Sequence, residues 1–454
     1  MATSPTRPPV LLADRPPARA GDPVHAIETP ALIVDLDAFD ANCDRLATRA
    51  AAWPHVRLRP HAKAHKTPQL ASRMARLLGP SAFAGLAVQK TGEAEAMAAA
   101  FAPGGGGVPP AATLLLTNEV VCPARLGRLA ALAASLPGRV GLAVDSEAGV
   151  AAAAAAASAA ATRLGVVIDC EAGQARCGVP DPPAAAALAR SVLAHPASLA
   201  LWGVQAYHGG IQHVRARRER EAAVRGVAAR AAAAAAAVRE VVVAAGPSAA
   251  SSTTPFLITG GGTGTWALDA AAGVLTEVQP GSFCFGDADY GANEEGLASG
   301  GGGDGGGEEH AWAQALWVLT QTMSVAPGRA VVDAGSKAVD TGSGPPRPAG
   351  RAAGLAYAGA GDEHGVLTVV AGGGGGGHHP PVPTPPADGG ATAAAWGGSG
   401  SAAAAAAALP PLGAKVWLQP SHCDPTVNLY DWIVGVKGGV VEGVWRVAGR
   451  GPGV

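Results

Sequence analysis

Leu164-Gly165-Val166-Val167-Ile168-Asp169 is a short apolar run that ends in a carboxylate. A run of this length without polar alternation is typical of a strand buried on both faces, as in a parallel sheet. Seven similar runs lie before and after it, separated by alanine-rich helical stretches. The eight runs cover residues 56–63, 82–88, 113–117, 140–145, 164–169, 201–207, 255–259 and 275–279. Eight strands joined by crossover helices predict a (β/α)8 TIM-type barrel, a fold of the α/β class.

After about residue 291 the pattern changes to longer β-type runs. These runs cover residues 316–322, 330–333, 366–370, 415–418 and 433–436, and Lys437-Gly438-Gly439-Val440 is typical of a hairpin turn. We therefore expect a barrel over residues 29–291 and a C-terminal antiparallel β domain over residues 292–454. The first strand, 31–36, can join either domain. Glycine- and alanine-rich inserts near 300–307 and 372–408 are expected to be mobile surface loops without chemistry.

Length and composition agree with two domains and a small-molecule partner. The chain has 454 residues, which exceeds the usual size of one core, and its net charge of -2 indicates neither a nucleic acid nor a membrane as partner. Six scattered cysteines without a CxxC pair are typical of reduced thiols, and the long hydrophobic tracts are polyalanine. We expect a cytoplasmic protein. Residues 1–28 are expected to form a flexible segment, with an organelle transit peptide as the alternative.

The first apolar run ends in Arg59-Pro60-His61-Ala62-Lys63-Ala64-His65-Lys66. In a barrel, residues that follow the strands share the C-terminal rim, where active sites are built. An amine among cations and near apolar walls is destabilised in its protonated form, and it becomes a usable nucleophile toward a carbonyl. This is what a Schiff-base lysine needs. The alternative is an ordinary basic loop that faces solvent.

Two glycine- and hydroxyl-containing loops follow the last two barrel strands. The first is Ile258-Thr259-Gly260-Gly261-Gly262-Thr263-Gly264-Thr265, and the second is Gln279-Pro280-Gly281-Ser282-Phe283. Glycines let backbone amides converge on a phosphate, and barrels commonly bind phosphate at these two loops. Together with a nucleophilic lysine on the same rim, they indicate pyridoxal 5'-phosphate.

Arg176 and Tyr207 follow the fifth and sixth predicted strands and would reach the ring of this cofactor. Alone, Arg176 would be read as a surface ion pair and Tyr207 as an aromatic residue that fills the barrel. With the lysine and the phosphate loops on the same rim, the cofactor contact is favoured.

The segment Ser421-His422-Cys423-Asp424-Pro425 lies in the β domain, directly after the run 415–418. If the chain is still extended there, His422 and Asp424 point to one side and Cys423 to the other. An imidazole and a carboxylate suit Mn²⁺ or Mg²⁺ better than Zn²⁺ and leave positions open for substrate. The alternative is a loop held by an Asx-type turn.

Several motifs together resemble the D-threonine aldolase and D-serine dehydratase family, which comprises fold-type III pyridoxal phosphate enzymes related to alanine racemase. The motifs are Thr29-Pro30-Ala31-Leu32, the lysine segment 59–66, Gln89-Lys90, residues 117–121, Gln205-Ala206-Tyr207-His208-Gly209-Gly210, residues 259–264, Asp287-Ala288-Asp289-Tyr290-Gly291 and residues 422–426. The similarity runs from about residue 25 to the C-terminus, outside the inserts.

The resemblance implies a role for each matching residue. Lys63, and not Lys66, would carry the cofactor as a Schiff base. Around the cofactor it implies Arg176, Tyr207, Thr259, Gly261, Gly262, Thr263, Gly281 and Ser282. His422 and Asp424 would bind the metal, with His422 also near the proton transfer. Phe283 departs from the family pattern, since many relatives have tyrosine there, so a hydroxyl contact to the phosphate is missing.

The spacing of the metal motif selects a reaction within the family. The aldolase branch has histidine-x-aspartate and the dehydratase branch histidine-x-cysteine, so His422-x-Asp424 favours the aldolase. The resemblance therefore implies a homodimeric lyase that cleaves D-β-hydroxy-α-amino acids such as D-threonine to glycine and an aldehyde. The alternatives are a metal-dependent D-serine or 3-hydroxyaspartate dehydratase and a non-catalytic pyridoxal phosphate carrier.

Overall fold

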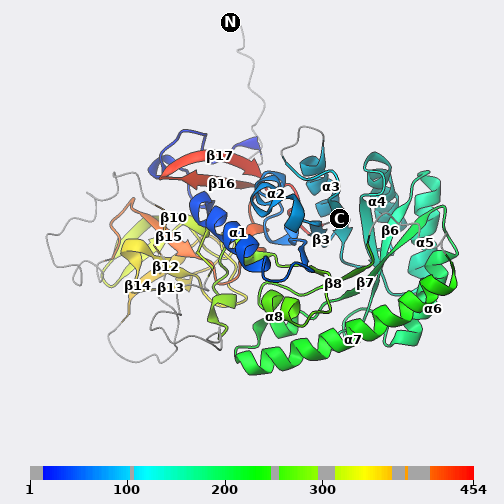
Figure 1. The fold of residues 1–454 in the computed structure, drawn as a ribbon. Helices are drawn as coiled ribbons and strands as arrows, with labels where there is room; N and C mark the ends of the chain where they lie inside the picture. The colour runs from blue at the N-terminus through cyan, green and yellow to red at the C-terminus, as the bar shows by residue number, and fades with distance from the viewer. Residues whose placement is uncertain are drawn as a thin grey trace, which may run out of the picture.

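The computed structural model describes residues 14–102, 107–246, 255–294, 312–370, 384–386 and 409–453. Within these residues the chain forms a barrel and a β domain that lie side by side (Figure 1). The predicted inserts fall almost entirely outside the described residues. No helix among the described residues is both long and apolar enough to cross a membrane.

The barrel has the eight predicted parallel strands, which confirms the expected fold class. They are β2 (Arg57–Leu58), β3 (Gly85–Val88), β4 (Thr113–Leu116), β5 (Val140–Val144), β6 (Leu164–Asp169), β7 (Leu199–Ala206), β8 (Leu257–Gly260) and β9 (Glu277–Val278). They run in the order β2-β9-β8-β7-β6-β5-β4-β3. Single bridges, Leu58 to Phe83 and His61 to Ala87, close the circle between β2 and β3.

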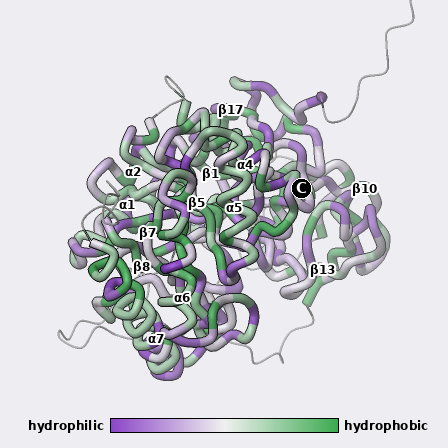
Figure 2. Tube along the Cα trace, turned by 90° about the vertical axis from the view of Figure 1, so that its right-hand side faces the viewer, coloured by the Kyte–Doolittle hydropathy of each residue, from purple (hydrophilic) through white to green (hydrophobic). Residues whose placement is uncertain are grey.

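Helices surround the barrel because alanine-rich segments have high helix propensity and bury one face. They are α2 (Pro68–Ala82), α3 (Thr91–Ala98), α4 (Pro123–Ser135), α5 (Glu147–Ala159), α6 (Pro182–Leu193), α7 (Arg217–Ala244) and α8 (Trp266–Ala271). The start of α5 is fixed by Ser146, whose hydroxyl accepts a hydrogen bond from the Gly149 N–H. In Figure 2, β5 is strongly hydrophobic, whereas α7 alternates between hydrophobic and hydrophilic segments.

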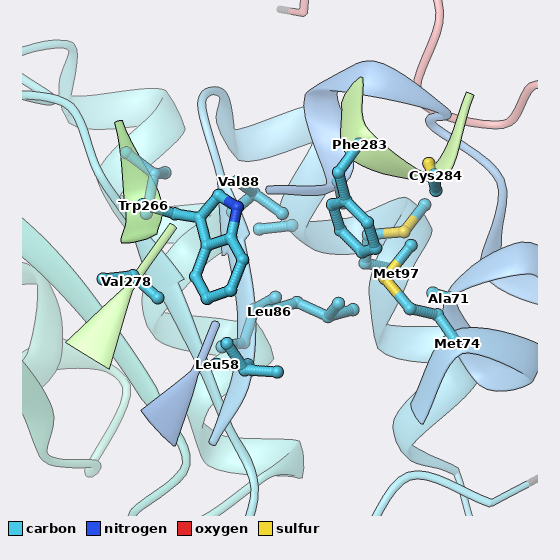
Figure 3. Packing of buried hydrophobic residues seen from close by; sticks show 14 of the residues in the cluster. Leu58, Ala71, Met74, Leu86, Val88, Met97, Trp266, Val278, Phe283 and Cys284 are labelled. Carbon is cyan, nitrogen blue, oxygen red and sulfur yellow. The ribbon is translucent and has the colours of Figure 1, made fainter. Parts of the chain in front are cut away.

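The core has one layer outside the barrel strands and another inside them. Outside, Leu86 and Val88 of β3 pack near Trp266, and Phe283 packs near Met97 (Figure 3). Inside, Trp202 fills the space beside two strands that carry glycine. A Cβ at Gly165 would lie 2.0 Å from the indole of Trp202, so this position requires glycine.

The β domain contains nine strands, and the N-terminal strand is one of them. The strands are β1 (Ala31–Asp35), β10 (Leu316–Ala326), β11 (Arg329–Val332), β12 (Arg347–Ala349), β13 (Leu355–Gly359), β14 (Gly365–Val369), β15 (Lys415–Gln419), β16 (Trp432–Lys437) and β17 (Val440–Arg446). All pairings are antiparallel except that of β1 with β16. β1 therefore lies in this sheet and not in the barrel.

Helix α1 (Leu36–Ala50) follows β1 and lies between the sheet and α2 of the barrel (Figure 1). Asn42 of this helix donates to the Ala313 carbonyl at 2.7 Å and accepts from the Ala313 N–H at 2.8 Å. Both bonds hold the segment by which the chain enters the β domain.

The expected flexible segment at residues 1–28 is wrong for residues 14–28. The N–H of Gly21 donates to the Val441 carbonyl at 2.9 Å, and Val24 and Ile27 are buried against the β domain. The physical reason is that β17 is an edge strand with open backbone groups, which this segment pairs with. Residues 1–13 lie outside the described residues.

Candidate active site

Lys63 lies at the C-terminal rim of the barrel, in the short turn η3 (Ala62–Ala64) that follows β2. Its side chain borders a cavity of about 100 Å³. The lining residues are His61, Lys63, Gln89, Thr117, Arg176, Gln205, Tyr207 and Gln279. Three residues that the sequence predicted at one site therefore meet at one cavity.

Tyr207 is the common neighbour of the two cations in this cavity. The Nζ of Lys63 lies 5.9 Å from the centroid of the Tyr207 ring, and the guanidinium carbon of Arg176 lies 5.6 Å from it. Both distances allow a cation–π attraction to the face of the ring. Tyr207 thus lines the cavity together with both cations.

The two histidines of the Lys63 motif are not the cationic neighbours that the sequence predicts, because both are buried. Burial, with the charge of Lys63 as the next cause, lowers the pKa of His61 well below its usual range. Burial also lowers the pKa of His65 to about 4. Both rings are neutral near pH 7. The Nδ1 of His61 accepts the N–H of Lys63 at 3.3 Å, which helps to shape the turn.

The remaining cations of the motif are paired with carboxylates. Arg59 is fully buried, and its Nε lies 2.7 Å from a carboxylate oxygen of Glu277. The Nζ of Lys66 lies 3.3 Å from Glu93 and donates to the Asn428 side-chain oxygen at 2.8 Å. Lys66 is therefore committed to structural contacts, whereas Lys63 lines the cavity.

The first glycine loop has a conformation that only glycine adopts easily. Gly261 has a φ of 68°, and a Cβ there would lie 2.5 Å from the Asp269 carboxylate. Gln212 clamps the loop, because its Oε1 accepts the Gly264 N–H at 2.9 Å and its Nε2 donates to Thr265 Oγ1 at 2.9 Å. The loop is thus held in a fixed conformation, and its glycines leave the backbone N–H groups accessible, as a phosphate-binding loop requires.

The second loop joins the first one directly. Thr263 Oγ1 accepts the Gly281 N–H at 3.1 Å and lies 3.3 Å from the hydroxyl of Ser282. A Cβ at Gly281 would lie 3.1 Å from the His61 carbonyl, so this loop also lies against the lysine turn. Thr259 differs: it is buried within β8, where its hydroxyl accepts from Gln279 Nε2 at 2.9 Å.

A Gly264→Ala variant is expected to bind pyridoxal phosphate about 10 to 100-fold more weakly, because the loop must shift by a large fraction of an ångström. The added Cβ would lie 2.6 Å from the backbone oxygen of Gln212. Titration of the cofactor against the apoprotein measures the change. Gly226→Ala, in α7 with open space around it, is the matched control and should bind normally. Equal affinities of both variants would contradict a phosphate role for the loop.

The carboxylate beneath the first loop predicts a pH dependence of stability. Burial raises the pKa of Asp269 from 3.8 to about 7, despite the hydrogen bond from Thr265. The folded protein therefore holds this proton more tightly than the unfolded chain, and stability falls as pH rises from about 4 to 7. Asp269→Asn should remove roughly 2 to 3 kcal/mol of this loss between pH 5 and 8. Urea unfolding of both proteins at pH 5 and pH 8 measures the free energy of unfolding. The same change with pH in both proteins would refute the prediction.

The metal motif has a different backbone from the one predicted. His422 is the N-cap residue of α10 (Cys423–Val427), so the chain is extended only up to His422 and Asp424 lies in the first helical turn. The predicted alternation of side chains is wrong because Cys423–Val427 form a helix directly after His422. The Thr426 hydroxyl donates to the His422 carbonyl at 3.1 Å.

Both predicted ligands lie in surroundings that favour positive charge. The Oδ1 of Asp424 is buried and has no hydrogen-bond partner, which is costly for a carboxylate without a cation. Burial disfavours the charged ring of His422, but the bond to Asp287 and the charges of Asp287, Asp424 and Asp289 outweigh it. They raise the pKa of His422 to about 9. This donor set fits a divalent cation.

The lysine motif and the metal motif lie next to each other. α10 packs against η3, and Lys66 of the first motif bonds Asn428, just past the second. Tyr290 lies beside His422, with ring centroids 6.0 Å apart, and its pKa is raised by burial and then by the charges of Tyr207 and Asp424. Tyr290 thus lies between the cofactor cavity and the metal motif. Phe283, in contrast, packs in the core against Trp312.

Sequence reasoning gave no role to an acidic group on the same rim. Glu119, Asp145 and Cys177 place ligand atoms within 4.8 Å of one another. Burial, followed by the charge of Glu119, raises the pKa of Asp169 to about 7. Glu119, Asp145 and Cys177 follow three successive strands, β4, β5 and β6, and Asp169 is the last residue of β6. The sequence gives no signal that they meet apart from these positions.

Comparisons with known proteins agree with this fold. Residues 34–289 match the family model "Alanine racemase, N-terminal domain", and residues 315–436 match "Putative serine dehydratase domain". The first match covers more than half of the chain, so the protein is an enzyme of the alanine racemase-like barrel class.

Relatives with known names narrow this class. The chain is 37% identical over 439 residues to D-threonine aldolase of Arthrobacter sp, covering 96% of each chain. It is 36% identical to 3-hydroxy-D-aspartate aldolase of Paracoccus denitrificans (strain Pd 1222), again covering 96% of each. The crystal structure of D-threonine aldolase from Filomicrobium marinum superimposes with a TM-score of 0.75 at 33% identity, covering 96% of this chain and 99% of that one. The chain therefore belongs to the D-threonine aldolase family of lyases, as the sequence motifs predicted.

Membership of this family implies pyridoxal phosphate as the cofactor. The residues present fit it, because Lys63 borders the cavity with Arg176 and Tyr207, and two glycine loops meet beside the lysine turn.

Proposed function

We propose that this chain is a D-threonine aldolase that uses pyridoxal phosphate and a divalent metal to cleave D-β-hydroxy-α-amino acids into glycine and an aldehyde. The observation that carries the proposal is the buried Asp424 oxygen without a partner, next to His422 and beside the turn of Lys63. A buried carboxylate oxygen without a hydrogen-bond donor is stabilised when a cation binds it.

Three residues of the cavity and the two glycine loops have defined tasks in this proposal. Pyridoxal phosphate, when bound, supplies an aldehyde that takes up an amine and a ring that accepts the electron pair released at Cα. Lys63 would hold the cofactor through Nζ, and a group near His422 would take the proton that the β-hydroxyl of the substrate loses. Arg176 and Tyr207 orient the ring, and the glycine loops fix the phosphate.

His422 and Asp424 would hold the metal, which supplies Lewis-acid chemistry at the β-hydroxyl of the substrate. Mn²⁺ or Mg²⁺ is favoured over Zn²⁺ because the donors are an imidazole and a carboxylate, while Cys423 is fully buried. In a dehydratase of D-serine or 3-hydroxyaspartate, the position of Asp424 would carry the cysteine. A non-catalytic carrier would need neither metal ligand.

Product analysis tests the proposal. The full chain, supplied with pyridoxal phosphate and Mn²⁺, should convert D-threonine to glycine and acetaldehyde, leave L-threonine unchanged and lose activity on chelation. Ammonia and a keto acid from D-serine or 3-hydroxyaspartate would instead identify a dehydratase, and no turnover of any substrate would support a carrier.

The family also implies a homodimer, which we propose for this chain. Light scattering should give about twice the monomer mass of 44.4 kDa. A monomeric active enzyme would exclude it. A cytoplasmic location stays a prediction.

A further inference from the structure

Asp287 connects the barrel to the metal motif. It follows η6 (Ser282–Cys284) in the last loop of the barrel, and its side chain is fully buried, at 0% exposure. Its Oδ2 lies 2.7 Å from His422 Nδ1 and accepts the Cys423 N–H at 3.0 Å. The same oxygen of Asp287 thus contacts the ring of His422 and the first residue of α10, the helix that contains Asp424.

This contact decides which ring nitrogen of His422 is available. A carboxylate oxygen can only accept a hydrogen bond, so Nδ1 must carry a proton. The neutral ring then has its lone pair on Nε2, and a metal can bind only there. The bond to Cys423 fixes the first turn of α10 at the same time, and with it the backbone of Asp424.

We propose that Asp287 is a positioning residue for the metal: it fixes the tautomer and orientation of His422 and anchors the helix start that presents Asp424. The inference rests on the proposed function, in which His422 and Asp424 are the ligands. Because Asp287 belongs to the barrel and His422 to the β domain, the metal site is complete only when the two domains are docked.

Asp289, two residues further on, is a built-in control. It carries the same charge near the same helix, but its carboxylate pairs with Arg215 and lies 2.6 Å from His213 Nδ1. It contributes to the field at His422 without a bond to the ring. Asp287→Asn and Asp289→Asn therefore separate the hydrogen bond from the general loss of negative charge.

The test is a titration of the full-length, cofactor-loaded protein with Mn²⁺. The electron paramagnetic resonance signal of free Mn²⁺ reports how much of the metal is bound. Asp287→Asn should raise the dissociation constant about 10 to 100-fold, the range for partners of metal-binding histidines. The reason is that the amide of asparagine can donate to Nδ1 and move the ring proton to Nε2. Asp289→Asn should change the Mn²⁺ dissociation constant by less than about 3-fold, since the effect of a nearby charge is screened. Equal effects of the two variants would overturn the positioning role.

A double-mutant cycle shows whether Asp287 acts through His422. His422→Ala should weaken Mn²⁺ binding by itself, and adding Asp287→Asn should weaken it little further. If His422→Ala leaves binding intact, the ligand assignment of the proposed function fails. If His422→Ala weakens binding but Asp287→Asn does not, only the positioning inference fails. Should Asp287→Asn not fold, Asp287→Glu keeps the charge and must still weaken Mn²⁺ binding, and wild-type affinity in that variant would overturn the inference.

Discussion

A Lys63→Ala protein is expected to lose D-threonine cleavage by roughly 10⁴-fold or more, the scale seen when a covalent nucleophile is removed. Lys63 is the lysine of its motif that borders the cavity, and Tyr207 lies 5.9 Å from its Nζ. Without it, the cofactor has no amine to hold it in the cavity, although the phosphate loops still bind it. Steady-state assays measure the loss. Borohydride reduction and peptide mass analysis should show no cofactor on residues 59–66.

The matched control is Lys66→Arg, which keeps the positive charge beside Glu93. This variant should retain covalent cofactor on Lys63 and most of its activity. Cofactor attached to Lys66, or an active Lys63→Ala protein, would overturn the assignment of the two lysines.

An Asp424→Ala protein is expected to lose metal-dependent cleavage by roughly 10³-fold, because a Lewis acid contributes several kcal/mol at the reacting oxygen. Its Mn²⁺ affinity should fall, whereas its cofactor affinity should stay the same, since the phosphate loops are unchanged. kcat/KM as a function of Mn²⁺ concentration provides the measurement. Asp431→Asn is the control: this carboxylate is partly exposed and pairs with Arg450 at 2.5 Å, so the loss of its charge should have little effect. Full activity of Asp424→Ala under chelation would rule out the metal site.

The barrel could be predicted because each strand carries its own local signal. Runs such as 140–145 and 164–169 are apolar throughout, and polar residues follow them at the rim. No apolar run marks β12 and β13, because β12 has only three residues and three of the five residues of β13 are exposed. The N-terminal segment was misjudged for a related reason: residues 21–24 pair with β17, which comes from the opposite end of the chain.

The site residues were predictable by type but not by environment. Lys63, Arg176 and Tyr207 were placed at one cavity from their positions after strands. The charge state of His61 and His65 depends on burial by distant segments, which no local pattern reports. The helix at Cys423 likewise replaced the expected extended chain, because His422 is fixed by Asp287 from a loop 135 residues earlier.

The contacts of Lys66 reach beyond its own motif. Its ammonium bonds Asn428, and its carbonyl accepts the Gly449 N–H at 3.0 Å, so the segments just before β16 and just after β17 hold the turn that presents Lys63. In a chimaera that takes its C-terminal sheet from a relative, Lys63 is expected to be displaced unless the contacts of Lys66 with Asn428 and Gly449 are kept. The two halves of this enzyme are therefore constrained to evolve together.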